Sequence, residues 1–164
     1  MRSFFGSIAL LALVVTSNGQ HNLVPNAGFE EYSTCPSHLG QFNEAVKNWR
    51  TPTRGTPNYY HACATQPEVS VPFNYFGHKK AIQGSAYAGI MTSNAFREYI
   101  TVELKASLQS GKTYRLHFYT AVILNAGCKS KGLDILFSGL PPFSDQPGTN
   151  LNIPASITVP INYP

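Results

Sequence analysis

Charged residues are scarce in this sequence. Only 12% of its 164 residues are Asp, Glu, Lys or Arg, and the formal net charge is +4. A chain with so little charge attracts polyanions weakly. The local basic clusters, Lys79–Lys80 and Lys129 with Lys131, are therefore interpreted as solvated loop charges. Nucleic acid is excluded as an expected partner.

Long hydrophobic runs are also missing. The longest apolar segment, Phe4–Val15, is shorter than the ~20 residues of a transmembrane helix. Arg2 precedes this segment, and Ser17 and Gly19 would occupy the −3 and −1 positions of a cleavage site. We therefore predict a signal peptide at residues 1–19, with a retained membrane anchor as the alternative. One domain would follow over residues 20–164, secreted or at the cell surface, with no transmembrane segment in the mature chain.

Cysteine is limited to three residues, Cys35, Cys63 and Cys128. Cysteines of exported proteins pair by default, so one is left over. Cys35 and Cys63 flank a segment that is rich in turn residues, and we predict that these two form the disulfide. Cys128 would then be free or paired outside the sequence. No Cys-x₂-Cys or His-x₃₋₅-His spacing occurs, which disfavours a zinc site.

The sequence lacks the common catalytic motifs. It has no Gly-x-Ser-x-Gly and no His-Glu-x-x-His, and Ala106 replaces the upstream glycine of a phosphate-binding loop at Ser110–Thr113. The acidic pairs Glu30/Glu31 and Glu98/Glu103 would each point to opposite faces of a strand. Catalysis is therefore not predicted.

What the sequence does contain is a hydrophobic period of two, which predicts β-strands. Apolar residues alternate over two runs, one at Ile100, Val102 and Leu104 and the other at Tyr114, Leu116, Phe118, Thr120 and Val122. The turn-forming residues Gln109–Lys112 lie between the runs and favour their pairing as antiparallel neighbours.

Further short strands are expected. Leu133, Ile135 and Phe137 mark one, Tyr87–Met91 and Ser156–Ile161 are weaker candidates, and a single helical turn is expected around Asn43–Lys47. Prolines make the last sixth of the chain an edge or a loop. Short strands with Gly- and Pro-rich connections predict an all-β fold, an antiparallel β-sandwich or jelly roll.

The segment Asn22–Glu31 begins the predicted domain. Leu23 and Val24 are expected to enter the core, a turn or bulge follows, and Phe29 packs inward. Oxygen atoms of Asn26 and Glu31 would lie near the Glu30 carboxylate, as a hard cation requires. The alternative is that Glu30 lies at a solvated strand end.

The same segment, followed by Trp49, resembles the opening of the galactose-binding-like β-sandwiches, which include many carbohydrate-binding modules. The likeness extends through the ranges Tyr32–Gln41, Gly55–Cys63, Val69–Pro72, Gly84–Gly89, Arg97–Ile100 and Gly111–Tyr114. These motifs resemble a subgroup in secreted and outer-membrane proteins of gliding-type bacteria.

The resemblance implies a structural Ca²⁺ held by Glu30, with Asn26 as a second candidate ligand. The family's acidic partner on the last strand has no counterpart before Pro164. The resemblance therefore implies a domain that is incomplete at its C-terminus and lacks its last strands.

Aromatic residues are abundant, with nine Tyr, ten Phe and one Trp. Aromatic faces cover the C–H faces of sugar rings, while polar groups satisfy the hydroxyls. Four aromatics in segments interpreted as loops, with one arginine, form the expected ligand-binding set: Tyr59, Tyr60, Tyr75, Phe76 and Arg97. Arg54, Asn58, Asn74 and His78 are further polar candidates, and core packing is the alternative role for Trp49, Tyr59 and Tyr60.

Two functions remain open. The first is a non-catalytic carbohydrate-binding module that contacts a glycan or another cell-envelope component. The second is a structural or adhesive envelope domain at the N-terminus of a larger outer-membrane or peptidoglycan-anchored protein.

Overall fold

The computed structural model describes residues 21–93, 96–121, 132–145 and 151–160. The predicted signal peptide, Val122 and Cys128 lie outside these ranges. The described chain consists mostly of short strands and connections, with one helical turn and one 3₁₀ turn. The predicted β-rich class is confirmed.

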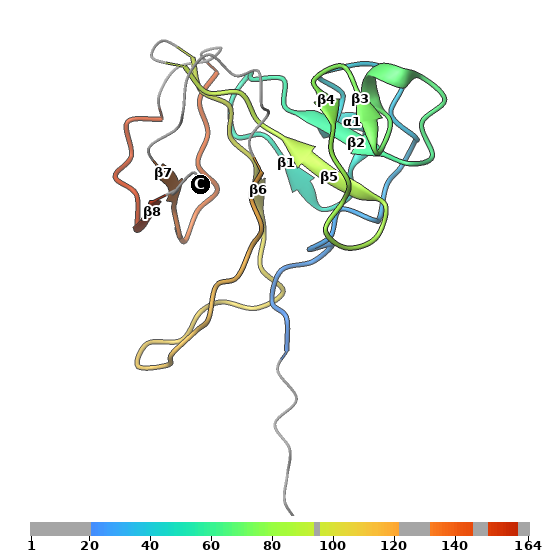
Figure 1. The fold of residues 1–164 in the computed structure, drawn as a ribbon. Coiled ribbons are helices and arrows are strands. Elements are labelled where there is room, and N and C mark those ends of the chain that lie inside the picture. Colours follow the sequence, from blue (N-terminus) through green and yellow to red (C-terminus); the bar gives the residue numbers. More distant parts are fainter. Residues whose placement is uncertain (1–20, 94–95, 122–131, 146–150, 161–164) are drawn as a thin grey trace, which may run out of the picture.

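In these described ranges, eight strands form four two-stranded antiparallel sheets (Figure 1). Strand β1 (Trp49–Arg50) pairs with β6 (Thr101–Val102), and β2 (Asn58–His61) pairs with β5 (Ala86–Gly89). Strands β3 (Phe73–Asn74) and β4 (Gly77–His78) form a tight hairpin, and β7 (Gly132–Ile135) pairs with β8 (Ile157–Pro160). The described strands do not join into two stacked sheets, so the sandwich or jelly roll stays a prediction.

The core lies where β2 meets the helical turn α1 (Phe42–Ala45). Phe42, Ala45, Val46, Tyr59 and Ala86 are buried there, and Phe29, Tyr32, Trp49, Ala88 and Ile100 pack around them. The amide of Phe42 donates to the Pro57 carbonyl at 3.3 Å, which fixes α1 beside the start of β2. The expected helical turn and the inward packing of Phe29 are confirmed.

Asn26 organises the turn that follows the N-terminal segment. Its side-chain amide donates to the carbonyls of Glu31 and Lys47 at 2.8 and 2.9 Å, and its Oδ1 accepts the amide N–H of Glu31 at 2.9 Å. Its own carbonyl accepts the indole N–H of Trp49 at 3.0 Å. The residue has a φ of 45°, a left-handed conformation that asparagine tolerates better than most residues. The predicted turn at Asn26–Gly28 is present.

The predicted strand at residues 114–122 is wrong over its described part. Residues 114–121 belong to no strand, and all of them except Phe118 are exposed. The turn at Gln109–Lys112 does form, with the Lys112 amide donating to the Gln109 carbonyl at 3.3 Å. However, contrary to the prediction, β6 does not pair with the segment that follows this turn. It pairs with β1.

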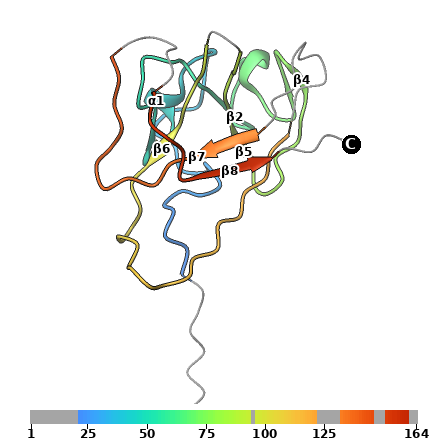
Figure 2. The same cartoon turned by 90° about the vertical axis from the view of Figure 1, so that its left-hand side faces the viewer.

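The physical reason is that an alternating hydrophobic pattern specifies which face of a strand is buried, but it does not specify which other strand pairs with it. After β6 the chain leaves the sheets and runs beside the N-terminal segment (Figures 1 and 2). The amide of Lys105 donates to the Leu23 carbonyl at 2.9 Å and ties the two segments together. The expected strands at 87–91, 133–137 and 156–161 correspond to β5, β7 and β8, although Phe137 lies beyond the end of β7.

Candidate functional site

A pocket of about 200 Å³ lies between β2, β5 and the β3–β4 hairpin. Its lining is mainly apolar, with a few polar side chains among aromatic rings. The lining residues are Asn58, Tyr60, Asn74, Phe76, Gly77, His78, Lys79, Tyr87, Gly89, Ile90 and Met91. We call it the Tyr60 pocket.

The β3–β4 hairpin forms one wall of the Tyr60 pocket. Its turn places Tyr75 and Phe76 between the strands, and the Phe76 amide donates to Asn74 Oδ1 at 3.0 Å. The Asn74 side-chain amide donates to the Tyr87 hydroxyl at 2.6 Å, and this hydroxyl donates to the Lys79 carbonyl at 3.3 Å. Asn74 therefore couples the hairpin to strand β5.

Tyr60 and Tyr87 form the opposite, aromatic wall. The two residues face each other across the β2–β5 pair, and their ring centroids lie 5.0 Å apart. A Cβ atom at Gly89 would come within 2.7 Å of Tyr60 Cε2. Glycine at this position is therefore what lets the Tyr60 ring lie over strand β5.

The Tyr60 side chain is almost entirely buried beside the pocket. Tyr60 is only 3% exposed, and no hydrogen-bond partner for its hydroxyl occurs among the described residues. Burial, followed by the nearby Tyr87 and Glu98, raises the pKa of this phenol, so it stays a protonated donor. Leaving such a group unpaired costs about 1–3 kcal/mol, which a ligand acceptor could recover.

Glu98 lies close behind the pocket and is 4% exposed. Its Oε1 accepts the amide N–H of Thr56 at 3.2 Å, and its Oε2 accepts that of Met91 at 2.7 Å. Burial raises the pKa of this carboxyl, although these hydrogen bonds act in the opposite direction. The carboxylate fixes the chain at Met91 and does not line the pocket.

The structure separates the predicted ligand-binding residues. The loop placement of Tyr59 and Tyr60 is wrong, because both are buried on strand β2, which agrees with the alternative of core packing. Tyr60 and Phe76 line the pocket, whereas Tyr75 is 69% exposed and packs edge-on against Phe76, with centroids 5.1 Å apart. Arg97 is exposed and is absent from the lining.

Three of the four further polar candidates, Asn58, Asn74 and His78, do line the pocket, and Arg54 does not. The sequence analysis missed Tyr87 and Gly89 as site residues. Both belong to the Gly84–Gly89 motif, in which two glycines and a tyrosine alternate with small residues. That spacing permits a ring from a neighbouring strand to lie against the backbone.

The two predicted calcium ligands have structural hydrogen bonds. Glu30 Oε1 accepts the amides of Ser85 and Ala86 at 2.9 and 3.1 Å, and Asn26 Oδ1 accepts that of Glu31. A cation would have to displace these donors or use Glu30 Oε2. No cluster of three or more His, Cys, Asp or Glu side chains with metal-binding geometry occurs in the described ranges. The calcium site stays a prediction.

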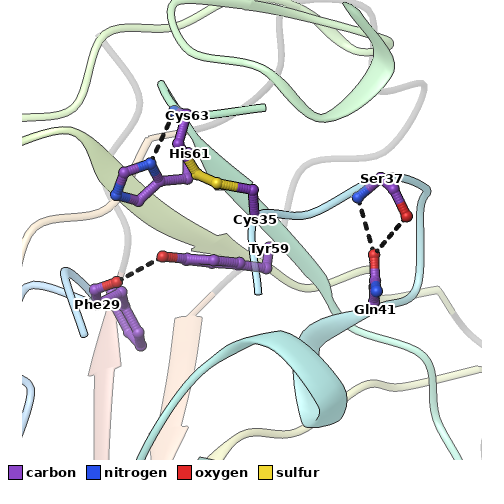
Figure 3. Close-up of a disulfide and its surroundings, with 7 residues drawn as sticks. All are labelled: Phe29, Cys35, Ser37, Gln41, Tyr59, His61 and Cys63. Carbon is purple, nitrogen blue, oxygen red and sulfur yellow. Dashed lines mark hydrogen bonds between the residues drawn. A yellow bond between two sulfur atoms is a disulfide. The ribbon is translucent and has the colours of Figure 1, made fainter. Parts of the chain in front are cut away.

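The predicted Cys35–Cys63 disulfide is confirmed, with Cα atoms 5.8 Å apart (Figure 3). It joins the loop before α1 to the residues that directly follow β2. Beside it, the Cys63 amide donates to His61 Nδ1 at 2.9 Å, and the Tyr59 hydroxyl donates to the Phe29 carbonyl at 2.8 Å. The disulfide and these bonds anchor strand β2, which carries Tyr60.

Acidification is expected to destabilise the fold through His61. Burial lowers the pKa of its imidazole, although Glu30 opposes this. Below the unfolded value of about 6.5, the unfolded chain binds a proton that the folded chain does not, so stability falls as the pH falls. Urea unfolding between pH 7.5 and pH 5 would measure this slope, and His61→Gln should flatten it.

The raised pKa of Glu98 acts with the opposite sign, because this group favours folding at low pH and loses that contribution as the pH rises. Glu98→Gln should therefore steepen the acid-side loss. An unchanged slope in His61→Gln would assign the acid sensitivity to other groups.

Comparisons with known proteins give no identity. No family model, no curated protein and no solved structure matches the chain. In the part of the chain that the structure describes, no helix is long and apolar enough to cross a membrane. The galactose-binding-like resemblance therefore stays a prediction.

Proposed function

We propose that this protein is a non-catalytic carbohydrate-binding module of the cell surface or the secreted fraction. The observation that carries the proposal is the Tyr60 pocket, which aromatic rings line together with the amide side chains of Asn58 and Asn74, and where the hydroxyl of the buried Tyr60 has no hydrogen-bond partner in the described chain. Ring faces and a few fixed polar groups are the elements from which sugar sites are built. Phe76 and the Tyr60–Tyr87 pair supply the rings.

The size of the pocket limits the ligand. Sites for drug-sized ligands span about 300–1,000 Å³, and this pocket measures about 200 Å³. It suits one sugar ring, or a substituent of a longer glycan. No carboxylate belongs to the described lining, whereas glycoside hydrolysis ordinarily uses two, which supports binding without chemistry.

A structural or adhesive envelope role is the second proposal, and exposed apolar side chains favour it. Leu140 is 81% exposed, Phe143 78% and Tyr119 59%. Exposed apolar residues that gather in a patch mark contact surfaces in folded proteins. In this role, the chain would belong to a larger outer-membrane or peptidoglycan-anchored protein.

The decisive experiment is calorimetric titration of the full chain with monosaccharides that a glycan array selects. We expect Phe76→Ala to weaken binding about tenfold, because an aromatic contact contributes ~0.5–1.5 kcal/mol beyond its buried area. Phe143→Ala is the matched control, since it removes an exposed ring that does not line the pocket.

Equal losses of sugar affinity in Phe76→Ala and Phe143→Ala would reject the pocket as the sugar site. A glycan array on which no glycan is bound would favour the structural role. The titrations are repeated in calcium and in EDTA. Thermal unfolding is followed in the same two solutions, and a melting temperature that is the same in both would reject the predicted calcium site at Glu30 and Asn26.

A further inference from the structure

The polar atoms of the Tyr60 pocket that remain available are mainly donors. Asn58 Oδ1 already accepts the Gly40 amide at 2.8 Å, and Asn74 Oδ1 accepts the Phe76 amide at 3.0 Å. The Tyr87 hydroxyl both accepts and donates. Among the tyrosine and asparagine groups, the Tyr60 hydroxyl, the Asn58 side-chain amide and one proton of the Asn74 amide remain, and His78 and Lys79 add two further polar side chains to the lining. A matching ligand must bring an acceptor.

The apolar side chains of the lining favour a ligand with an apolar group beside that acceptor. Ile90 and Met91 follow strand β5 directly and line the pocket together with the Phe76 ring. Ile90 and Met91 are 37% and 51% exposed, so a sugar hydroxyl placed against them would be partly desolvated and would gain no hydrogen-bond partner from their side chains. A methyl group would gain free energy by the same burial.

Charge in and around the pocket has both signs. Lys79 and His78 belong to the lining, and the Glu98 carboxylate lies behind it, close enough to influence the Tyr60 phenol. A Glu98 carboxylate would repel an anionic ligand while Lys79 would attract it, so the two charges give no clear preference for an anion. A neutral acceptor avoids this repulsion.

We propose that the Tyr60 pocket recognises an acetamido group carried on a sugar ring. This inference rests on the proposed function and specifies its ligand. The Tyr60 hydroxyl donates to the acetyl carbonyl, and the methyl group packs against Ile90 and Met91. A site built around a buried donor discriminates strongly against analogues that lack the acceptor, so the acetyl group is the selected feature.

The test is titration of the full chain with N-acetylglucosamine, glucose, glucosamine and glucuronate. We expect N-acetylglucosamine to bind at least tenfold more tightly than the other three. Tyr60→Phe keeps the ring and removes the hydroxyl, so the preference over glucose should fall by about tenfold. Tyr59→Phe is the matched control, because it removes a hydroxyl that bonds to the Phe29 carbonyl outside the pocket.

Met91→Asp is a second variant, independent of the buried ring, because Met91 is 51% exposed. It places a charge where the methyl group would pack, and should weaken N-acetylglucosamine more than glucose. A preference that survives both Tyr60→Phe and Met91→Asp would overturn the assignment.

The outcomes separate the inference from the proposed function. Equal binding of glucose and N-acetylglucosamine, or tightest binding of glucuronate, would overturn the acetamido preference and leave a sugar module. If N-acetylglycine methylamide binds as tightly as N-acetylglucosamine, the acetamido contact holds and the carbohydrate function fails. Binding of none of these probes would overturn both.

Discussion

Removing the Cys35–Cys63 disulfide should lower the free energy of unfolding by about 3–4 kcal/mol. The bond joins residues that are 28 positions apart, and closing a loop of that length removes entropy mainly from the unfolded chain. In the folded chain the disulfide ties the loop before α1 to the residues that directly follow β2, next to the hydrogen bond between the Cys63 amide and His61. Without the disulfide, strand β2, which carries Tyr60, loses one of its anchors.

Urea unfolding of the Cys35→Ser/Cys63→Ser variant would measure this loss. The control is the parent chain with and without reductant, which should show the same difference, while reductant should leave the double variant unchanged. A loss below about 1 kcal/mol would mean that the unfolded chain is already held compact in this region, because residual structure reduces the entropic effect.

Phe42→Ala should destabilise the fold by about 3–5 kcal/mol. The Phe42 side chain is fully buried and packs edge-on against Phe29, with ring centroids 6.2 Å apart. Truncation removes this contact and leaves a cavity between α1 and β2 that the surrounding backbone can fill only in part. Since a domain has about 5–15 kcal/mol of stability in total, the variant should be partly unfolded at moderate urea concentrations.

Phe143→Ala is the control for Phe42→Ala, because that ring is 78% exposed. We expect its unfolding free energy to stay within about 0.5 kcal/mol of the parent value. If the two variants lose the same amount, the residues around α1 do not form the stabilising core.

The features that follow local rules were predictable from the sequence. Residues near Asn43 form the expected helical turn, and the strands near Tyr87, Leu133 and Ile157 lie close to their predicted positions. The disulfide was predictable because two cysteines flank one turn-rich segment. Each of these depends on neighbours in the sequence, or on the oxidising compartment that the predicted signal peptide implies.

Strand β2 shows why the rest was missed. All four of its residues, from Asn58 to His61, are buried, so the strand has no polar face and no alternation to detect. It also lies between Pro57 and Cys63, in a stretch that resembles a loop by composition. The strand is buried by contacts with α1 and the 3₁₀ turn Pro67–Val69, and its hydrogen-bonded edge is covered by β5, so its burial depends on tertiary contacts that the local pattern does not contain.

The candidate site was predictable only in outline. Aromatic and amide residues that were selected by type, such as Phe76 and Asn74, do meet at the pocket. The unpaired hydroxyl of Tyr60 and the position of Glu98 depend on which strands pair, and hydrogen-bond satisfaction cannot be counted before that is known.

The close approach of Gly89 to the Tyr60 ring has an evolutionary consequence. A side chain at position 89 and an aromatic ring at position 60 would compete for the same space, so a substitution at one position changes what the other can accommodate. A lineage that replaces Tyr60 with a small residue is released from glycine at 89, whereas one that keeps the ring must keep the glycine. Linked substitution at these two positions would therefore mark the lineages that have given up the pocket.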